Sequence, residues 1–249
     1  MRRAYRRMAR VTGLAGLALA ICLAAAPANA ACRLALALGL DVSGSVDDVE
    51  YRLQLGGVAD ALMASEVQAA MFAMPGAHVS LAVYQWGAED QQNLLIGWTD
   101  LKSREDVTRV TESLVAYEAR FRDPYTALGA AMRYGAALLR ERPECWQHTL
   151  DISGDGPSNA GPAPQDALTD PQSRITVNAL VINPGSRDNV TKDLTYTKTL
   201  LEHYRTHVLR GPGAFAETAR DFDDFKAAMT RKLLRELRPA ALSLAPPVQ

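Results

Sequence analysis

Apolar segments of strand length alternate with amphipathic segments of helix length along most of the chain. Strands separated by helices pair in parallel and need helices on both faces of their sheet, so this order predicts a doubly wound α/β fold. Six segments have the strand pattern: residues 33–42, 78–87, 93–101, 145–153, 174–183 and part of 211–219. The third follows the second so closely that we expect it to be the one antiparallel edge strand of a mainly parallel, six-stranded sheet.

The segments between these strands carry helix signals. Ser45 with Asp48, and Ser103 with Asp106, have the spacing of a capping box, in which two side chains satisfy N–H groups at the start of a helix. The first helix is predicted to bury one face, formed by Val49, Leu53, Val58 and Leu62. The predicted helices span residues 47–64, 103–117, 125–142, 193–208 and 220–237.

Residues 1–30 have the three parts of a secretory signal peptide: a basic start with five arginines, an apolar stretch, and small residues at Ala28 and Ala30. We predict cleavage after Ala30 and a periplasmic or secreted protein, and the export route stays open. An uncleaved membrane anchor is the alternative, and the short apolar stretch argues against it. The expected organisation is a signal peptide, one domain over residues 31–238 and a disordered tail over 239–249, with no transmembrane segment after cleavage.

The composition of the cleaved chain limits its partners and its redox state. Cleavage would remove five arginines and no acidic residue, so the formal net charge would fall from −1 to −6. Such a chain lacks the basic surface that nucleic acids require, and we expect no nucleic-acid partner. Cys32 and Cys145 remain after cleavage. An even pair of cysteines in an exported protein indicates a disulfide, with two buried free thiols as the alternative.

Small oxygen-bearing side chains follow two of the predicted strands and precede one helix. Asp41, Ser43 and Ser45 come after the first strand, Thr126 lies in the loop entering the third helix, and Asp155 follows the fourth strand. Ligand sites lie at the carboxyl ends of parallel strands, so these loops can share one site. Helix capping explains Ser45 but leaves Asp41 and Ser43 unexplained. Oxygen ligands without histidine or cysteine suit a hard cation, so we predict Mg²⁺ or Mn²⁺.

The motif D-x-S-x-S after the first strand, a loop threonine, and an aspartate before glycine after the fourth strand resemble the metal-ion-dependent adhesion site of von Willebrand factor type A domains. The resemblance covers residues 34–237. Segments such as VYQWG, DISGDGPSN and GPGAFAETARDFDDF are similar to an exported bacterial subfamily of uncharacterised function.

This resemblance implies a set of ligands and a kind of partner. Ser43, Ser45 and Thr126 would coordinate through their hydroxyls, and Asp41 and Asp155 would hold the ion directly or through water. In the family, an aspartate or glutamate of a partner protein fills an open coordination position. The implied function is therefore an exported, non-catalytic domain that binds a partner's acidic residue through the ion.

The resemblance bears on two further features. In the family's sheet the first and fourth strands are parallel neighbours, which implies that Cys32 and Cys145 lie at the same end of adjacent strands, within reach of a disulfide. Asp151 departs from the apolar residue that is usual in the fourth strand. Either it is a buried acid behind the metal site, or the strand is partly exposed.

Two other functions remain open. Haloacid-dehalogenase-like phosphatases also have a nucleophilic aspartate after the first strand and a GDG loop that holds Mg²⁺, which would make Asp41 a nucleophile. Ser43 stands where that family has its general acid, and Ala160 where its loop ends in an acid, and both substitutions argue against catalysis. The ion could instead be purely structural. His203 and His207 are spaced for one helix face and could bind a transition metal, but with no third ligand nearby we expect them to face solvent.

Overall fold

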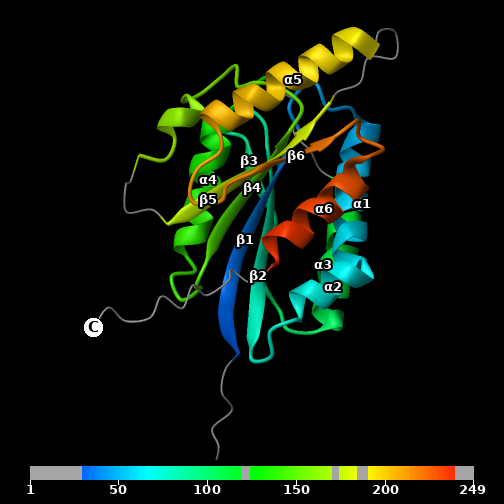
Figure 1. Cartoon of the computed structure of the whole chain (residues 1–249), viewed down its shortest axis with the longest axis vertical. Coiled ribbons are helices and arrows are strands. Elements are labelled where there is room, and N and C mark those ends of the chain that lie inside the picture. The colour runs from blue at the N-terminus through cyan, green and yellow to red at the C-terminus, as the bar shows by residue number, and fades with distance from the viewer. Residues whose placement is uncertain (1–29, 119–123, 170–173, 184–189, 239–249) are drawn as a thin grey trace, which may run out of the picture.

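The computed structural model describes residues 30–118, 124–169, 174–183 and 190–238. The predicted signal peptide and the predicted tail lie outside these residues. The described residues form a six-stranded sheet in the order β3-β2-β1-β4-β5-β6, in which β3 is antiparallel to β2 and the other pairs are parallel (Figure 1). The strands are β1 (Ala31–Asp41), β2 (Ala77–Trp86), β3 (Gln92–Leu101), β4 (His148–Gly154), β5 (Ile175–Ile182) and β6 (Ala216–Ala219). The predicted doubly wound fold with one antiparallel edge strand is confirmed.

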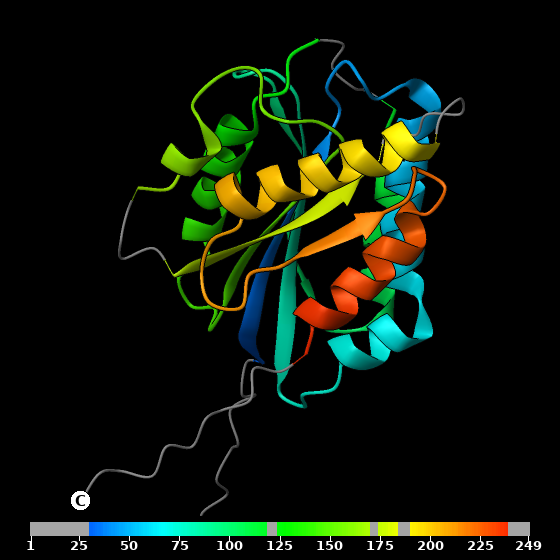
Figure 2. The same cartoon turned by 45° about the horizontal axis from the view of Figure 1, so that its top comes forward.

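Helices cover both faces of the sheet (Figure 2). One face is covered by α1 (Asp48–Met63), α2 (Ser65–Met71), α3 (Arg104–Val115) and α6 (Phe225–Glu236). The other is covered by α4 (Leu128–Arg140) and α5 (Val190–His207), with a short 3₁₀ helix, η1 (Pro164–Asp166), beside them. Across the described ranges, no helix has both the length and the apolar run that crossing a membrane requires.

The central strand β1 is buried on both faces because its two sets of alternating side chains are both apolar. Leu34, Leu36, Leu38 and Leu40 point into the core under α1, α3 and α6. On the opposite face, Ala35 and Ala37 are small enough for α4 to approach the sheet closely. This packing fixes the strand along its length and so positions its last residue, Asp41.

The start of α1 differs from the prediction. Asp47, not Ser45, is the N-cap: its side chain accepts hydrogen bonds from the N–H groups of Val49 and Glu50, and Glu50 completes the capping box. Of the predicted apolar face, Val58 and Leu62 are buried and Leu53 is partly buried, whereas Val49 is 67% exposed. The buried face also includes Tyr51, Leu55 and Ala61. The later start of the helix leaves Ser45 in the loop, where its hydroxyl is free for another role. The capping box at Ser103 is confirmed.

Helix α2 was not predicted, because its seven residues show too little periodicity to stand out from the turn that follows. Val67 and Met71 nevertheless pack into the core beside α6. The other predicted elements are present with ends shifted by a few residues.

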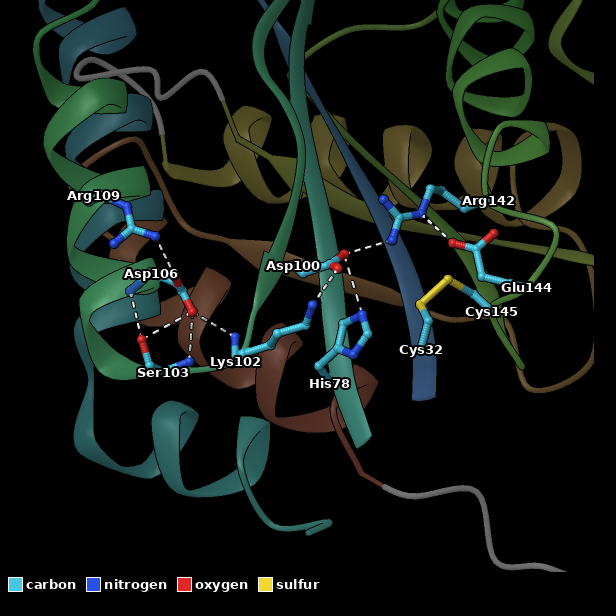
Figure 3. A network of polar contacts seen from close by, with 10 residues as sticks. All are labelled: Cys32, His78, Asp100, Lys102, Ser103, Asp106, Arg109, Arg142, Glu144 and Cys145. Carbon is cyan, nitrogen blue, oxygen red and sulfur yellow. Dashed lines mark hydrogen bonds and ion pairs between the residues drawn. A yellow bond between two sulfur atoms is a disulfide. The ribbon is translucent and has the colours of Figure 1, made fainter. Parts of the chain in front are cut away.

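The amino end of the central strands is closed by a disulfide. Cys32 of β1 and Cys145, just before β4, are bonded, with their Cα atoms 4.5 Å apart, which confirms the predicted pairing. Both cysteines are buried. Next to the bridge lies a network of ion pairs around Asp100, which Figure 3 shows.

Asp151 lies inside the fold rather than on an exposed strand. It is 1% exposed in the middle of β4 and faces α6, where the Nζ atom of Lys232 is 2.8 Å from its Oδ1 atom. Lys232 is also 2.6 Å from Oε1 of Glu236, and Asn178 of β5 donates a hydrogen bond to the same oxygen. The acid therefore belongs to a paired ionic cluster between the sheet and α6.

Candidate functional site

The two central strands, β1 and β4, end side by side in polar residues. Asp41 is the last residue of β1, and Asp155 directly follows β4. The chain leaves β1 towards β2 on one side, whereas β4 and β5 extend the sheet on the other, so the strand order reverses here. Open α/β sheets have a crevice at such a reversal, at the carboxyl ends of the strands.

A tight loop after β1 turns three oxygen-bearing side chains towards Asp155. The N–H group of Ser43 donates to Oδ1 of Asp41 at 2.8 Å. The hydroxyls of Ser43 and Ser45 are hydrogen-bonded at 3.3 Å, and the Ser45 hydroxyl donates to Oδ1 of Asp155 at 2.7 Å. Four of the five residues predicted for the site therefore form one continuous set of contacts.

The fifth residue, Thr126, lies in an adjacent loop that is fastened to the loop of Asp155. The Thr126 N–H group donates to Oδ1 of Asn159 at 2.7 Å, and the Asn159 N–H group donates to the Thr126 carbonyl at 2.9 Å. The next residue, Ala127, bonds the end of β2 through the Gly87 carbonyl. Thr126 is buried, and none of the described hydrogen bonds joins its side chain to the other four residues.

The two carboxylates of the site have no positively charged partner among the described residues. Asp41 and Asp155 are 0% and 1% exposed, and the Oδ2 atom of each has no hydrogen-bond partner among the described residues. Nor does any ion pair of the described residues include either acid. Burial and the nearby charge of Asp155 raise the pKa of Asp41 to about 8. Burial also raises the pKa of Asp155, against the hydrogen bond from Ser45.

Residues that the sequence analysis did not single out hold the site in place. The Gln54 side chain donates to the Asp41 carbonyl at 2.9 Å. From α5, Tyr196 donates to the Asp155 carbonyl at 3.1 Å and Tyr204 to the Gly156 carbonyl at 3.3 Å. The two tyrosines are eight residues apart and so share a helix face, which is the signal that could have identified them.

Gly154 is required where α5 crosses the site. A Cβ atom on this residue would clash with the Tyr204 hydroxyl and would lie 3.0 Å from Oδ2 of Asp41. Only a residue without a side chain lets the strand end, the tyrosine and the carboxylate meet this closely.

The donors available for a cation are all oxygens. Across the described residues, no group of three or more histidine, cysteine, aspartate or glutamate side chains is arranged to hold a metal ion. A cation at this site would therefore depend on the two carboxylates together with neutral hydroxyls. Such a set suits a hard ion that keeps part of its water shell.

Comparison with known proteins agrees with this architecture. Residues 31–241 match the model of a family described as "Protein of unknown function (DUF1194)". The chain belongs to the DUF1194 family. No match is found for it among curated proteins.

Three solved structures with a similar fold illustrate the likeness. Proximal thread matrix protein 1 from the mussel byssus, with a zinc-occupied MIDAS motif, has a TM-score of 0.56 at 15% identity, over 84% of this chain and 47% of that one. The pilus adhesin SpaC from Lactobacillus rhamnosus GG, in its open conformation, has a TM-score of 0.56 at 13% identity, over 82% and 30% of the two chains. The von Willebrand factor type A protein from Catenulispora acidiphila has a TM-score of 0.51 at 13% identity, over 83% and 42%.

These likenesses show the fold. The DUF1194 domain has the von Willebrand factor A fold, as the resemblance of its sequence implies. In each case it spans half or less of the length of the structure it matches.

Proposed function

We propose that the DUF1194 domain is an exported, non-catalytic binding domain that holds one divalent cation, Mg²⁺ or Mn²⁺. The ligands are Asp41, Ser43, Ser45, Thr126 and Asp155. A partner protein completes the coordination with the carboxylate of an aspartate or glutamate. The observation that carries the proposal is the pair of buried carboxylates, each with one oxygen that has no partner among the described residues.

The free-energy argument starts from burial. A buried carboxylate without a counter-charge is costly, and two facing each other are worse, because each charge opposes the other. A divalent cation offsets both charges at once and gives the Oδ2 atoms of Asp41 and Asp155 a partner. Neutral hydroxyls then complete the set without adding negative charge, so the ion stays a Lewis acid with a coordination position open to one more oxygen ligand.

Position supports an external anion as that ligand. Ser45 is exposed, whereas Asp41 and Asp155 lie beneath it. The following helix, α1, begins at Asp48 and presents the positive end of its dipole on this side of the sheet. Loops carried by a rigid sheet are common positions for binding surfaces. The similar folds of the mussel protein with its zinc-occupied MIDAS motif and of the pilus adhesin agree with such a role.

Hydrolysis by the site is the less favoured function. An aspartyl nucleophile would need a proton donor close by, and the hydroxyl at Ser43 is a poor one at neutral pH. All four histidines are described, and none has a hydrogen bond or ion pair with a predicted ligand. The site therefore has the parts for holding an ion but not for a nucleophile with its base.

The first test measures the ion. We expect one Mn²⁺ per chain in electron paramagnetic resonance and calorimetric titrations, with Mg²⁺ competing for the same site. Asp41→Asn and Thr126→Ala should weaken binding by roughly tenfold or more. Asp47→Asn is the matched control, since it removes one charge from the same loop while asparagine caps a helix as well as aspartate does. Equal affinity in Asp41→Asn and the wild type would contradict the proposed ligands.

The second test measures the partner. Immobilised domain should retain a binding protein from envelope extract in Mg²⁺, release it in chelator, and fail to retain it when Ser43 is changed to alanine. Once that protein is identified, amide replacement of one acidic residue in it should abolish capture. Retention that is unchanged in chelator would exclude a metal-bridged contact, even if the domain binds Mn²⁺.

A further inference from the structure

The last turns of α5 hold a pair of histidines that the oxygen site does not use. His203 and His207 are one helical turn apart, and their ring centroids are 4.9 Å from each other. Both side chains are partly buried. The Nε2 atom of His203 is shielded from solvent and has no hydrogen-bond partner among the described residues. In the tautomer that carries its proton on Nδ1, this nitrogen is a Lewis base without a ligand.

Both histidines line a hollow that a second segment of the chain helps to form. A pocket of about 370 Å³ lies between them and the loop over residues 158–165. Besides the two imidazoles it is lined by polar side chains of that loop, Ser158, Asn159 and Gln165. The two histidines, which were expected to face solvent, are partly exposed and also face a second element of the fold.

We propose that His203 and His207 form a second cation site, which takes a borderline transition-metal ion such as Zn²⁺ or Cu²⁺. Two imidazoles at positions i and i+4 of a helix can reach one ion, because residues four apart lie above one another on the same face. Imidazole nitrogen suits Zn²⁺ and Cu²⁺, whereas oxygen sites suit Mg²⁺ and Mn²⁺. The pocket leaves room for water or a loop oxygen to complete the coordination.

The second site lies close to the first but differs from it in chemistry. Its pocket is lined by Asn159, whose side chain and backbone hold Thr126. The same helix reaches the loop of Asp155 through Tyr196 and Tyr204. An ion bound by the histidines would therefore join α5 to the loop that carries part of the oxygen site. The proposal itself does not depend on the function of that site.

The experiment localises the ion on tag-free protein by nuclear magnetic resonance. Substoichiometric Cu²⁺ should broaden the ring signals of His203 and His207 and leave those of His78 and His148 sharp. Calorimetry in the Asp41→Asn background, which removes a ligand of the oxygen site, should still detect one bound Zn²⁺. His203→Ala and His207→Ala in that background should each weaken Zn²⁺ binding by about tenfold or more.

Thr206→Ala provides the matched control for the two histidine variants. Thr206→Ala changes an exposed neighbour on the same turn and should leave Zn²⁺ affinity unchanged. Circular dichroism should show that the histidine variants keep their fold. Cu²⁺ that broadens His78 or His148 instead, or Zn²⁺ affinity that is the same with and without the two imidazoles, would overturn the proposal.

Discussion

The two ends of the central sheet surround their acidic side chains in opposite ways. At the amino end, the partly buried Asp100 lies among basic side chains: Lys102 and Arg142 are 2.9 and 2.6 Å away and His78 is 3.3 Å away (Figure 3). At the carboxyl end, Asp41 and Asp155 face each other, and none of the described ion pairs includes them. The amino end also has the disulfide, which the carboxyl end lacks among the described residues.

The consequence is visible in the acids' proton affinities. Burial alone would raise the pKa of Asp100, but hydrogen bonds from Lys102 and Arg142 outweigh it and hold that pKa well below its usual range. Burial and Asp155 instead raise the pKa of Asp41 to about 8. Cations of the chain itself thus pair with the acid at the amino end, whereas the two acids at the carboxyl end have no such partner among the described residues. We infer that the amino end serves stability and that the carboxyl end serves binding.

The largest expected effect comes from removing the disulfide at the amino end of the sheet. Replacing both Cys32 and Cys145 by serine removes a link between residues 113 apart. The chain-entropy model then gives a loss of about 4–5 kcal/mol in the free energy of unfolding, measured by urea denaturation. Mn²⁺ affinity at the other end should not change in the variant that remains folded.

A second measurement covers the case in which that variant does not fold. Wild-type protein from its native compartment, unfolded without reductant, should leave both cysteines unlabelled by a thiol reagent. The same protein with reductant should melt at a lower temperature. Equal stability of oxidised and reduced protein would mean that the bridge does not stabilise this end.

An intermediate effect is expected from adding Mg²⁺, which should bind at the carboxyl end of the sheet. Mg²⁺ at about 100 times its dissociation constant should raise the free energy of unfolding by about 2.7 kcal/mol, because the ion binds the folded state. Asp41→Asn, which binds the ion at least tenfold more weakly, should keep about 1.4 kcal/mol of this increase or less at the same Mg²⁺ concentration. It should retain the stability of the metal-free wild type, since it removes one of two opposed charges. The check is thermal denaturation with and without Mg²⁺. A stabilisation that is undiminished in Asp41→Asn would place the ion elsewhere.

How much of this contrast the sequence predicts depends on how far apart along the chain the contacting residues lie. Asp41, Ser43 and Ser45 were identifiable because a short motif follows an unmistakable buried strand. The N-cap was assigned to Ser45 instead of Asp47, because both loop residues satisfy the capping pattern and the contact that decides between them is with Asp155, 110 residues away. The roles of Tyr196, in α5, and Asn159, in a loop, are likewise contacts with segments distant in the sequence, which only the folded chain brings together.

The amino-end network illustrates the same limit. The disulfide was predictable because the resemblance places two cysteines on neighbouring strands. Asp100, Arg142 and His78 come from three separate elements, and no local pattern marks them as a group. Similarly, Asp151 stood out as an acid in an apolar strand, but its partner Lys232 lies 81 residues further on in a helix that looks merely amphipathic.

The smallest expected effect tests whether the paired acid is stabilising at all. Asp100→Asn should lower the free energy of unfolding by about 1 kcal/mol at neutral pH, as expected for a partly exposed ion-pair network. A carboxylate whose pKa is depressed in the folded state stabilises the fold above its unfolded pKa, and this contribution disappears as the pH falls towards the folded value. The difference between wild type and variant should therefore be constant near neutral pH and shrink below about pH 4.

Asp60→Asn is the matched control, because Asp60 forms a single exposed pair with Lys226 and should show a smaller difference at every pH. If urea denaturation gives the same small difference for both variants at neutral pH, the clustered cations at the amino end add nothing beyond an ordinary surface pair, and the contrast between the two ends reduces to the disulfide.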